Sequence, residues 1–79
     1  MSFERFEEIL RWKYNRGIHN FIGNLSGNKY SIQNSSGRRC GYSLFINGTA
    51  ARQGSFFAIS CEIWDRESEV AGVKEDSYV

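Results

Sequence analysis

The chain has 79 residues, of which 41% are hydrophobic and 24% charged, and its ten basic and nine acidic residues leave a formal net charge of +1. The apolar share excludes a disordered chain, and the length predicts a single domain, residues 1–79, because second domains are rare below about 100 residues. No apolar run approaches the roughly 20 residues of a membrane helix, and acid and base follow Met1 too closely for a signal peptide, so we expect a cytoplasmic protein with no membrane partner.

Residues 2–15 are predicted to form a helix. Ser2 is a favoured N-cap residue, and Glu4 places a negative charge in the first turn, where the helix dipole stabilises it. Gly17 suits the position that follows the end of a helix. Apolar side chains recur at spacings of three and four, which predicts one buried stripe of Phe3, Phe6, Ile9, Leu10 and Tyr14.

After Gly17 the apolar period changes to two, which is typical of β-strands. Short turns follow the first two candidate strands, and a longer loop over residues 47–54 follows the third. From Asp65 onward the chain is polar and acidic, so residues 65–79 are predicted to form an acidic C-terminal tail. The predicted fold is α+β, an N-terminal helix packed on one face of a four-stranded antiparallel β-meander, with strands at residues 18–25, 29–34, 39–47 and 55–64.

The positions of the two cysteines relative to each other depend on the register of the last two predicted strands. If Asn47 lies opposite Gly54, then Cys40 pairs with Cys61, and apolar residues meet apolar residues along both strands. The two sulfur atoms are then expected to be neighbours under the helix. We expect free thiols, because the predicted compartment is reducing, with a disulfide as the alternative.

Residue types that carry catalysis are sparse in this chain. A structural zinc site needs four Cys or His ligands, usually in close pairs, whereas His19, Cys40 and Cys61 stand far apart. A serine or cysteine nucleophile needs a base within reach, and His19 is more simply a partly exposed strand residue. Glu67 and Glu69 fall in the predicted tail, where nothing would raise a carboxyl pKa. We therefore expect no enzyme activity, no catalytic residue, no metal and no cofactor.

The charges are unevenly distributed along the chain. Residues 1–52 hold eight basic and three acidic residues, and residues 53–79 hold two basic and six acidic ones. Such asymmetry is typical of proteins that contact nucleic acid or an acidic partner. The alternative is neutralisation within the molecule, with Arg16, Arg38 and Arg39 close to Glu62 and Asp65. The candidate contacts for phosphate or acidic groups are Arg16, Arg38, Arg39 and Arg52.

One face of the predicted sheet is free of the helix. If Leu44 and Phe57 face the helix, the residues that face away include three aromatic side chains and one arginine. Such a face is typical of a protein-binding patch or of a platform on which bases stack. The alternative is that the tail or the loops cover it. The candidate partner-binding residues on this open face are Phe45, Phe56, Trp64 and Arg39.

These observations favour a small non-enzymatic binding protein that inhibits or occludes a larger macromolecular partner, either a protein or a protein–nucleic-acid complex. In size and in its scarcity of motifs the chain is similar to the compact inhibitors carried by phages and other mobile elements, such as anti-CRISPR and immunity proteins. A single-stranded nucleic-acid-binding β-sheet module is the first alternative. A homodimer that associates through the open sheet face is the second.

Overall fold

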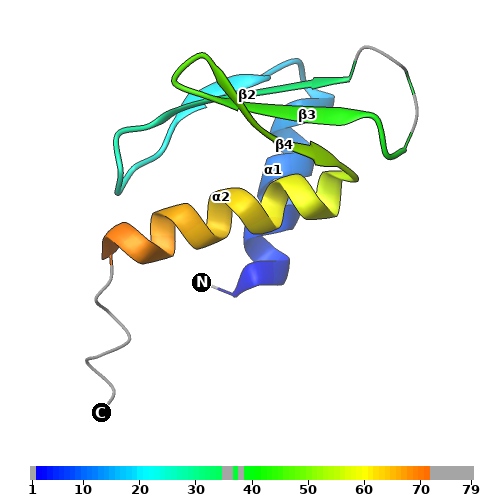
Figure 1. Ribbon diagram of the computed structural model, residues 1–79. Coiled ribbons are helices and arrows are strands. Elements are labelled where there is room, and N and C mark those ends of the chain that lie inside the picture. Colours follow the sequence, from blue (N-terminus) through cyan, green and yellow to red (C-terminus); the bar gives the residue numbers. More distant parts are fainter. Residues whose placement is uncertain (1, 35–36, 38, 72–79) are drawn as a thin grey trace.

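The computed structural model describes residues 2–34, 37 and 39–71. Its four strands form one antiparallel sheet in the order β1-β2-β3-β4, and both helices lie on the same side of that sheet, where they cross each other (Figure 1). The predicted α+β class, the N-terminal helix and the four-stranded antiparallel meander are confirmed. The elements in chain order are α1 (Phe3–Asn15), β1 (Asn20–Ile22), β2 (Lys29–Asn34), β3 (Tyr42–Ile46), β4 (Thr49–Gly54) and α2 (Phe56–Ala71).

The N-terminal helix forms for the reasons seen in the sequence. The side chain of Ser2 caps α1 by accepting a hydrogen bond from the backbone N–H of Arg5 at 3.2 Å. Glu4 lies in the first turn, and Leu10 is buried against the rest of the core. Gly17 follows the helix with φ of +88°, a left-handed conformation that glycine adopts without strain.

The third and fourth strands are joined by a tight hairpin, and the longer loop predicted over residues 47–54 is wrong. Asn47 and Gly48 both have positive φ, +52° and +86°. Two such residues in succession make the two-residue turn whose twist matches that of antiparallel strands. The chain therefore reverses at once, and Thr49–Gly54 pairs with β3 as β4.

The predicted strand over residues 55–64 is also wrong, because this segment begins α2. Ser55 caps the helix by accepting a hydrogen bond from the backbone N–H of Ala58 at 3.1 Å. The buried side chains of α2, Phe56, Ile59, Ser60 and Ile63, recur at spacings of three and four. A short apolar run fits a strand or a buried helix almost equally well. The N-cap at Ser55 favours the helix here. Residues 65–71 of the predicted tail continue α2, and residues 72–79 lie outside the described residues.

The expected pairing of Cys40 with Cys61 is wrong, because Cys61 lies on a helix and not on a strand next to β3. Cys40 is exposed in the connection between β2 and β3, and Cys61 lies partly buried on α2. Both thiols are free, as expected, but they do not face each other across paired strands. The partner of β3 is β4, in which Gly54 lies opposite Tyr42.

The core lies between the sheet and the helices. Alternate side chains of β2 and β3 point toward α2, and Leu10 of α1 closes the same cluster from the side. The opposite face of the sheet is not covered by a helix (Figure 1). The buried apolar residues are Leu10, Tyr30, Ile32, Leu44, Ile46, Phe56, Ile59 and Ile63.

Candidate binding groove

The aromatic platform predicted on the open sheet face does not form. Phe45 lies on that face, in a shallow depression of about 530 Å³ bordered mainly by polar residues of β1 and β2. Phe56 is only 3% exposed because it is part of the core on the other side of the sheet. Trp64 contacts α1, and Arg39 is exposed in the β2–β3 connection. The prediction failed because it assigned strand alternation to a helical segment.

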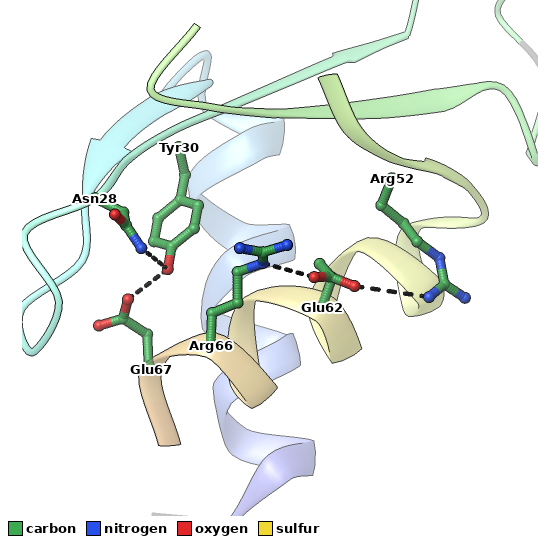
Figure 2. A network of polar contacts seen from close by, with 6 residues as sticks. All are labelled: Asn28, Tyr30, Arg52, Glu62, Arg66 and Glu67. Carbon is green, nitrogen blue, oxygen red and sulfur yellow. Dashed lines mark hydrogen bonds and ion pairs between the residues drawn. The ribbon is translucent and has the colours of Figure 1, made fainter. Parts of the chain in front are cut away.

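The predicted basic contacts are also dispersed. The guanidinium of Arg16 lies 4.4 Å from the centroid of the Trp12 ring. Arg52 on β4 forms an ion pair of 3.7 Å with Glu62, which also holds Arg66 at 2.6 Å (Figure 2). Arg38 lies outside the described residues. The charge pattern predicted neutralisation of Glu62 and Asp65 by Arg16, Arg38 and Arg39. The structure pairs Glu62 with Arg52 and Arg66 instead.

An apolar groove runs between the two helices and the β1–β2 hairpin, with a volume of about 720 Å³. Two residues at the rim that the β1–β2 hairpin forms have largely exposed side chains: Ile22 is 60% and Leu25 57% exposed. We call this feature the apolar groove. Its walls are formed by Phe6, Ile9 and Lys13 of α1, by Phe21, Ile22 and Leu25 of the hairpin, and by Ile63, Trp64 and Glu67 of α2.

An aromatic cluster extends the apolar groove along the contact between the helices. Trp64 packs edge-to-face on Phe6 and on Phe3, with ring centroids 5.1 and 5.6 Å apart. Phe3 makes the same type of contact with Phe57 at 5.5 Å. Edge-to-face pairs of this kind stabilise helix contacts by about 1 kcal/mol each beyond their buried area. Because Phe57 is 54% exposed, the apolar surface continues from the groove to the first turn of α2.

The carboxylate of Glu67 fastens the rim of the groove to α2. It accepts hydrogen bonds from the backbone N–H groups of Leu25 and Ser26 at 3.1 and 3.2 Å, and from the hydroxyl groups of Ser26 and Tyr30. The side-chain amide of Asn28 donates to the Tyr30 hydroxyl at 3.4 Å, so the bonds form one network (Figure 2). The hairpin loop that carries Leu25 is therefore held in one position.

Gly23 is required by the same network. A Cβ atom at this position would lie 2.7 Å from Oε1 of Glu67 and closer still to Oε2. Real Cβ atoms do not approach other atoms so closely, so any side chain here would displace the carboxylate. The glycine thus lets the backbone of the loop approach the helix.

The protonation states of the network follow from its contacts. Partial burial acts to raise the pKa of Glu67, but the hydrogen bonds from Ser26, Tyr30 and the loop backbone outweigh it and hold that pKa below the ordinary value. For Tyr30, burial first and the hydrogen bond to Glu67 second raise the pKa above its usual value. At neutral pH an ionised carboxylate therefore accepts a bond from a neutral phenol, and the network is intact.

Glu67 is the residue of the groove network that the sequence interpretation missed. It was placed in a solvated tail together with Glu69, although it lies four residues after Ile63 and three after Trp64. Those spacings put it on the buried side of α2 once that segment is recognised as a helix. The missing signal was thus the helix itself.

Lys13 is the only cationic side chain that lines the apolar groove among the described residues. Its Nζ lies 5.6 Å from the centroid of the Phe21 ring, a cation–π contact. In the described part of the chain, no carboxylate lies within ion-pair distance of Lys13. The groove wall therefore carries one positive charge, at Lys13, and one negative charge, at Glu67, whose carboxylate is engaged by the hairpin loop and Tyr30.

The remaining candidates for chemistry do not assemble a site within the described residues. His19 stacks on Tyr14 with ring centroids 4.3 Å apart. No group of three potential metal ligands is found in the part of the chain that the structure describes. Within residues 2–34, 37 and 39–71, no helix is long and apolar enough to cross a membrane.

Comparison of the chain with protein families, with curated proteins and with solved structures finds no match.

Proposed function

We propose that this chain is a small non-enzymatic binding protein that occludes a surface of a larger protein partner, and that it binds through the apolar groove. One observation carries the proposal: exposed apolar side chains are gathered in a concave site whose rim is fastened by Glu67. Exposed apolar residues are common when scattered, but a contiguous concave patch is typical of an interaction site. A rim held in place before binding also lowers the entropic cost of association.

The composition of the groove favours a protein over a nucleic acid. Nucleic-acid sites neutralise several phosphates with arginine and lysine, and single strands stack their bases on exposed aromatic rings. Only Lys13 brings positive charge to the groove among the described residues, and Phe6 and Trp64 are engaged edge-to-face rather than presented as flat platforms. A groove with mainly apolar walls matches the apolar anchors of a protein interface.

A second copy of the chain is a less suitable occupant than a different protein. To fill the groove, the copy would have to present a ridge of neighbouring exposed apolar side chains. Among the described residues, the large exposed apolar side chains outside the groove and its aromatic cluster lie on separate elements: Trp12 on α1, Ile18 before β1 and Val70 near the end of α2. They do not form a ridge along one helix or strand.

Affinity purification from the native host, with and without nuclease, tests the proposal. The wild-type chain is compared with Leu25→Glu, which places a charge at the exposed rim, and with Val70→Glu, which places the same charge outside the groove. We expect a stoichiometric protein partner that survives nuclease, is lost with Leu25→Glu and is retained with Val70→Glu. Binding that depends on nucleic acid, or that is equal for both variants, contradicts the proposal.

A further inference from the structure

The free edge of the sheet beside the groove carries unused backbone hydrogen-bonding groups. β1 is the first strand in the sheet order and, among the strands of the described residues, has a neighbour on one side only. The N–H of Gly23 donates to the carbonyl of Asn28 and the N–H of Ile32 to the carbonyl of His19, both at 2.9 Å. In an antiparallel pair, the backbone N–H and C=O groups of one residue bond to the neighbouring strand, and those of the next residue point away from it. The register therefore directs the N–H and C=O groups of Asn20 and Ile22 to the free edge.

This edge lacks most of the features that prevent a further strand from pairing. Protected edges are very short, carry charges, prolines or bulges, or are covered by other segments; of these features β1 has the short length. β1 consists of Asn20, Phe21 and Ile22, and it pairs with β2 without a bulge. Asn20 and Ile22 are both exposed. The hairpin loop that follows is tied to α2 by Glu67, so it is held away from the edge.

The apolar groove lies directly beside this edge, on the helix side of the sheet. Phe21 points from β1 into the groove, between its two neighbours on the strand that expose their side chains. In a strand added to β1, alternate residues would point to the same side as Phe21. The groove would therefore receive every second side chain of the added segment.

Lys13 supplies the chemical preference of the site. Its Nζ lies over the Phe21 ring, on the side of β1 to which alternate residues of an added strand would point. A carboxylate on that strand would meet a positive charge that has no ion-pair partner among the described residues. Because the surroundings are apolar, such a pair is screened less by water than a pair on an open surface.

We propose that the protein partner supplies an extended segment that pairs with β1 as an additional strand, inserts alternate apolar side chains into the groove and sets a carboxylate against Lys13. This inference rests on the proposed function and specifies its mode. In such binding, the main-chain hydrogen bonds give affinity, and the pockets for alternate side chains give specificity.

A random dodecapeptide library displayed on phage is the probe for this site. The full chain is used as bait, and peptides that bind it are counter-selected on Ile22→Pro. Proline at this position removes an N–H that points to the free edge and leaves the hydrogen bonds to β2 in place. It also restricts the preceding residue to extended backbone, which Phe21 already adopts in β1. Ile22→Val is the matched control, because it keeps both the N–H and a branched apolar side chain.

We expect enriched peptides in which apolar residues alternate with other residues and an Asp or Glu recurs. Ile22→Pro should raise the dissociation constant of their synthetic versions about tenfold, since an intermolecular backbone hydrogen bond and close approach are lost. Ile22→Val should raise it much less, because it removes one methyl group from the groove rim and leaves the N–H in place. Lys13→Glu should reverse the preference from acidic to basic peptides. In wild type, the bound peptide should slow amide hydrogen exchange at Asn20 and Ile22, a measurement that does not require any variant to fold.

The possible failures are distinguishable. Peptides whose apolar residues recur at three and four, or whose binding leaves the exchange of Asn20 and Ile22 unchanged, overturn strand addition and leave the groove as a protein-binding site. A library that enriches no peptide on wild type over Ile22→Pro overturns it as well. If Leu25→Glu leaves both the peptides and the purified partner bound, the groove is not the site, and the proposed function fails together with the inference.

Discussion

At the scale of single residues, Glu67 couples the stability of the fold to pH. Its pKa in the folded state is lower than the ordinary value of 4.5, because hydrogen bonds from the loop and from Tyr30 outweigh the effect of burial. The folded state therefore favours the ionised form. The resulting stabilisation is fully present above the ordinary pKa and is lost as the pH falls through the lowered one.

We expect Glu67→Gln to lower the free energy of unfolding by about 2 kcal/mol at pH 7, because charge-assisted hydrogen bonds to the loop are lost. The variant should lose less stability than wild type when the pH is lowered below the ordinary carboxyl pKa. Urea denaturation followed by tryptophan fluorescence at neutral and acidic pH measures both effects. Glu69→Gln is the control, since Glu69 is exposed on the same helix. Equal pH profiles for the two variants would contradict the role of Glu67.

Ser60 gives a prediction of the opposite sign. It is fully buried, and its hydroxyl has no hydrogen-bond partner among the described residues. We expect Ser60→Ala to stabilise the protein by about 1 kcal/mol, because it removes an unsatisfied polar group and improves helix propensity. Ser55→Ala should instead destabilise it by about 1 kcal/mol, since that hydroxyl caps α2. Thermal unfolding compares the pair, and a lower melting temperature for Ser60→Ala would show that its hydroxyl is satisfied.

At the scale of elements, adjacent phenylalanines distinguish helix from strand at the start of α2. A strand with Phe57 toward the core would leave Phe56 outside, whereas in the helix Phe56 is 3% and Phe57 54% exposed. We expect Phe56→Ala to cost about 4 kcal/mol of stability, and Phe57→Ala much less because its ring is half in solvent. Chemical denaturation of both variants measures the difference. A larger loss of stability for Phe57→Ala than for Phe56→Ala would favour a strand, and not a helix, over this segment.

The two helices also show which elements a sequence can predict. In α1, a cap at Ser2, an apolar stripe and a stop at Gly17 all agree, and the helix was found with nearly its observed bounds. In α2, the apolar residues fit both periods, and the decisive signals were local: the turn at Asn47-Gly48 and the cap at Ser55. Because Asn47-Gly48 was interpreted as part of a long loop, the fourth strand was predicted over residues 55–64, which cover the N-cap and the start of α2.

The candidate site could not be predicted for the same reason. The groove is lined by residues of both helices and of the β1–β2 hairpin, so it depends on α2 crossing α1 on the same side of the sheet (Figure 1). Lys13 lies in a segment predicted as a helix and Phe21 in one predicted as a strand, and both predictions agree with the structure. Trp64 and Glu67 line the groove only because their segment is a helix. Phe57, which was predicted to face the helix from a strand, is instead the exposed aromatic residue of α2, and Trp64 packs on Phe3 and Phe6.

At the scale of the whole molecule, the two oppositely charged parts of the chain neutralise each other in part. Arg52 from the basic part meets Glu62 from the acidic part, which also holds Arg66 (Figure 2). Within α1, Arg5 and Arg11 pair with Glu8 and Glu7. The uncovered sheet face is mostly polar, with Gln53 donating a hydrogen bond to Ser43 at 3.4 Å. Neither feature produces a continuous basic surface over the described residues.

We therefore expect no binding of the full chain to a single-stranded oligonucleotide, even at low salt. Phosphate binding depends on several clustered cations, and its strength falls steeply as salt is added. Among the described candidates, Arg16 stacks on Trp12, Arg52 pairs with Glu62, and Arg39 stands apart in the β2–β3 connection. Gel retardation across a salt series is the measurement, with Arg39→Ala beside wild type. Retardation that weakens with salt, and whose slope falls by about one unit in Arg39→Ala, would instead establish a nucleic-acid contact at that connection and favour the nucleic-acid module over a protein-binding groove.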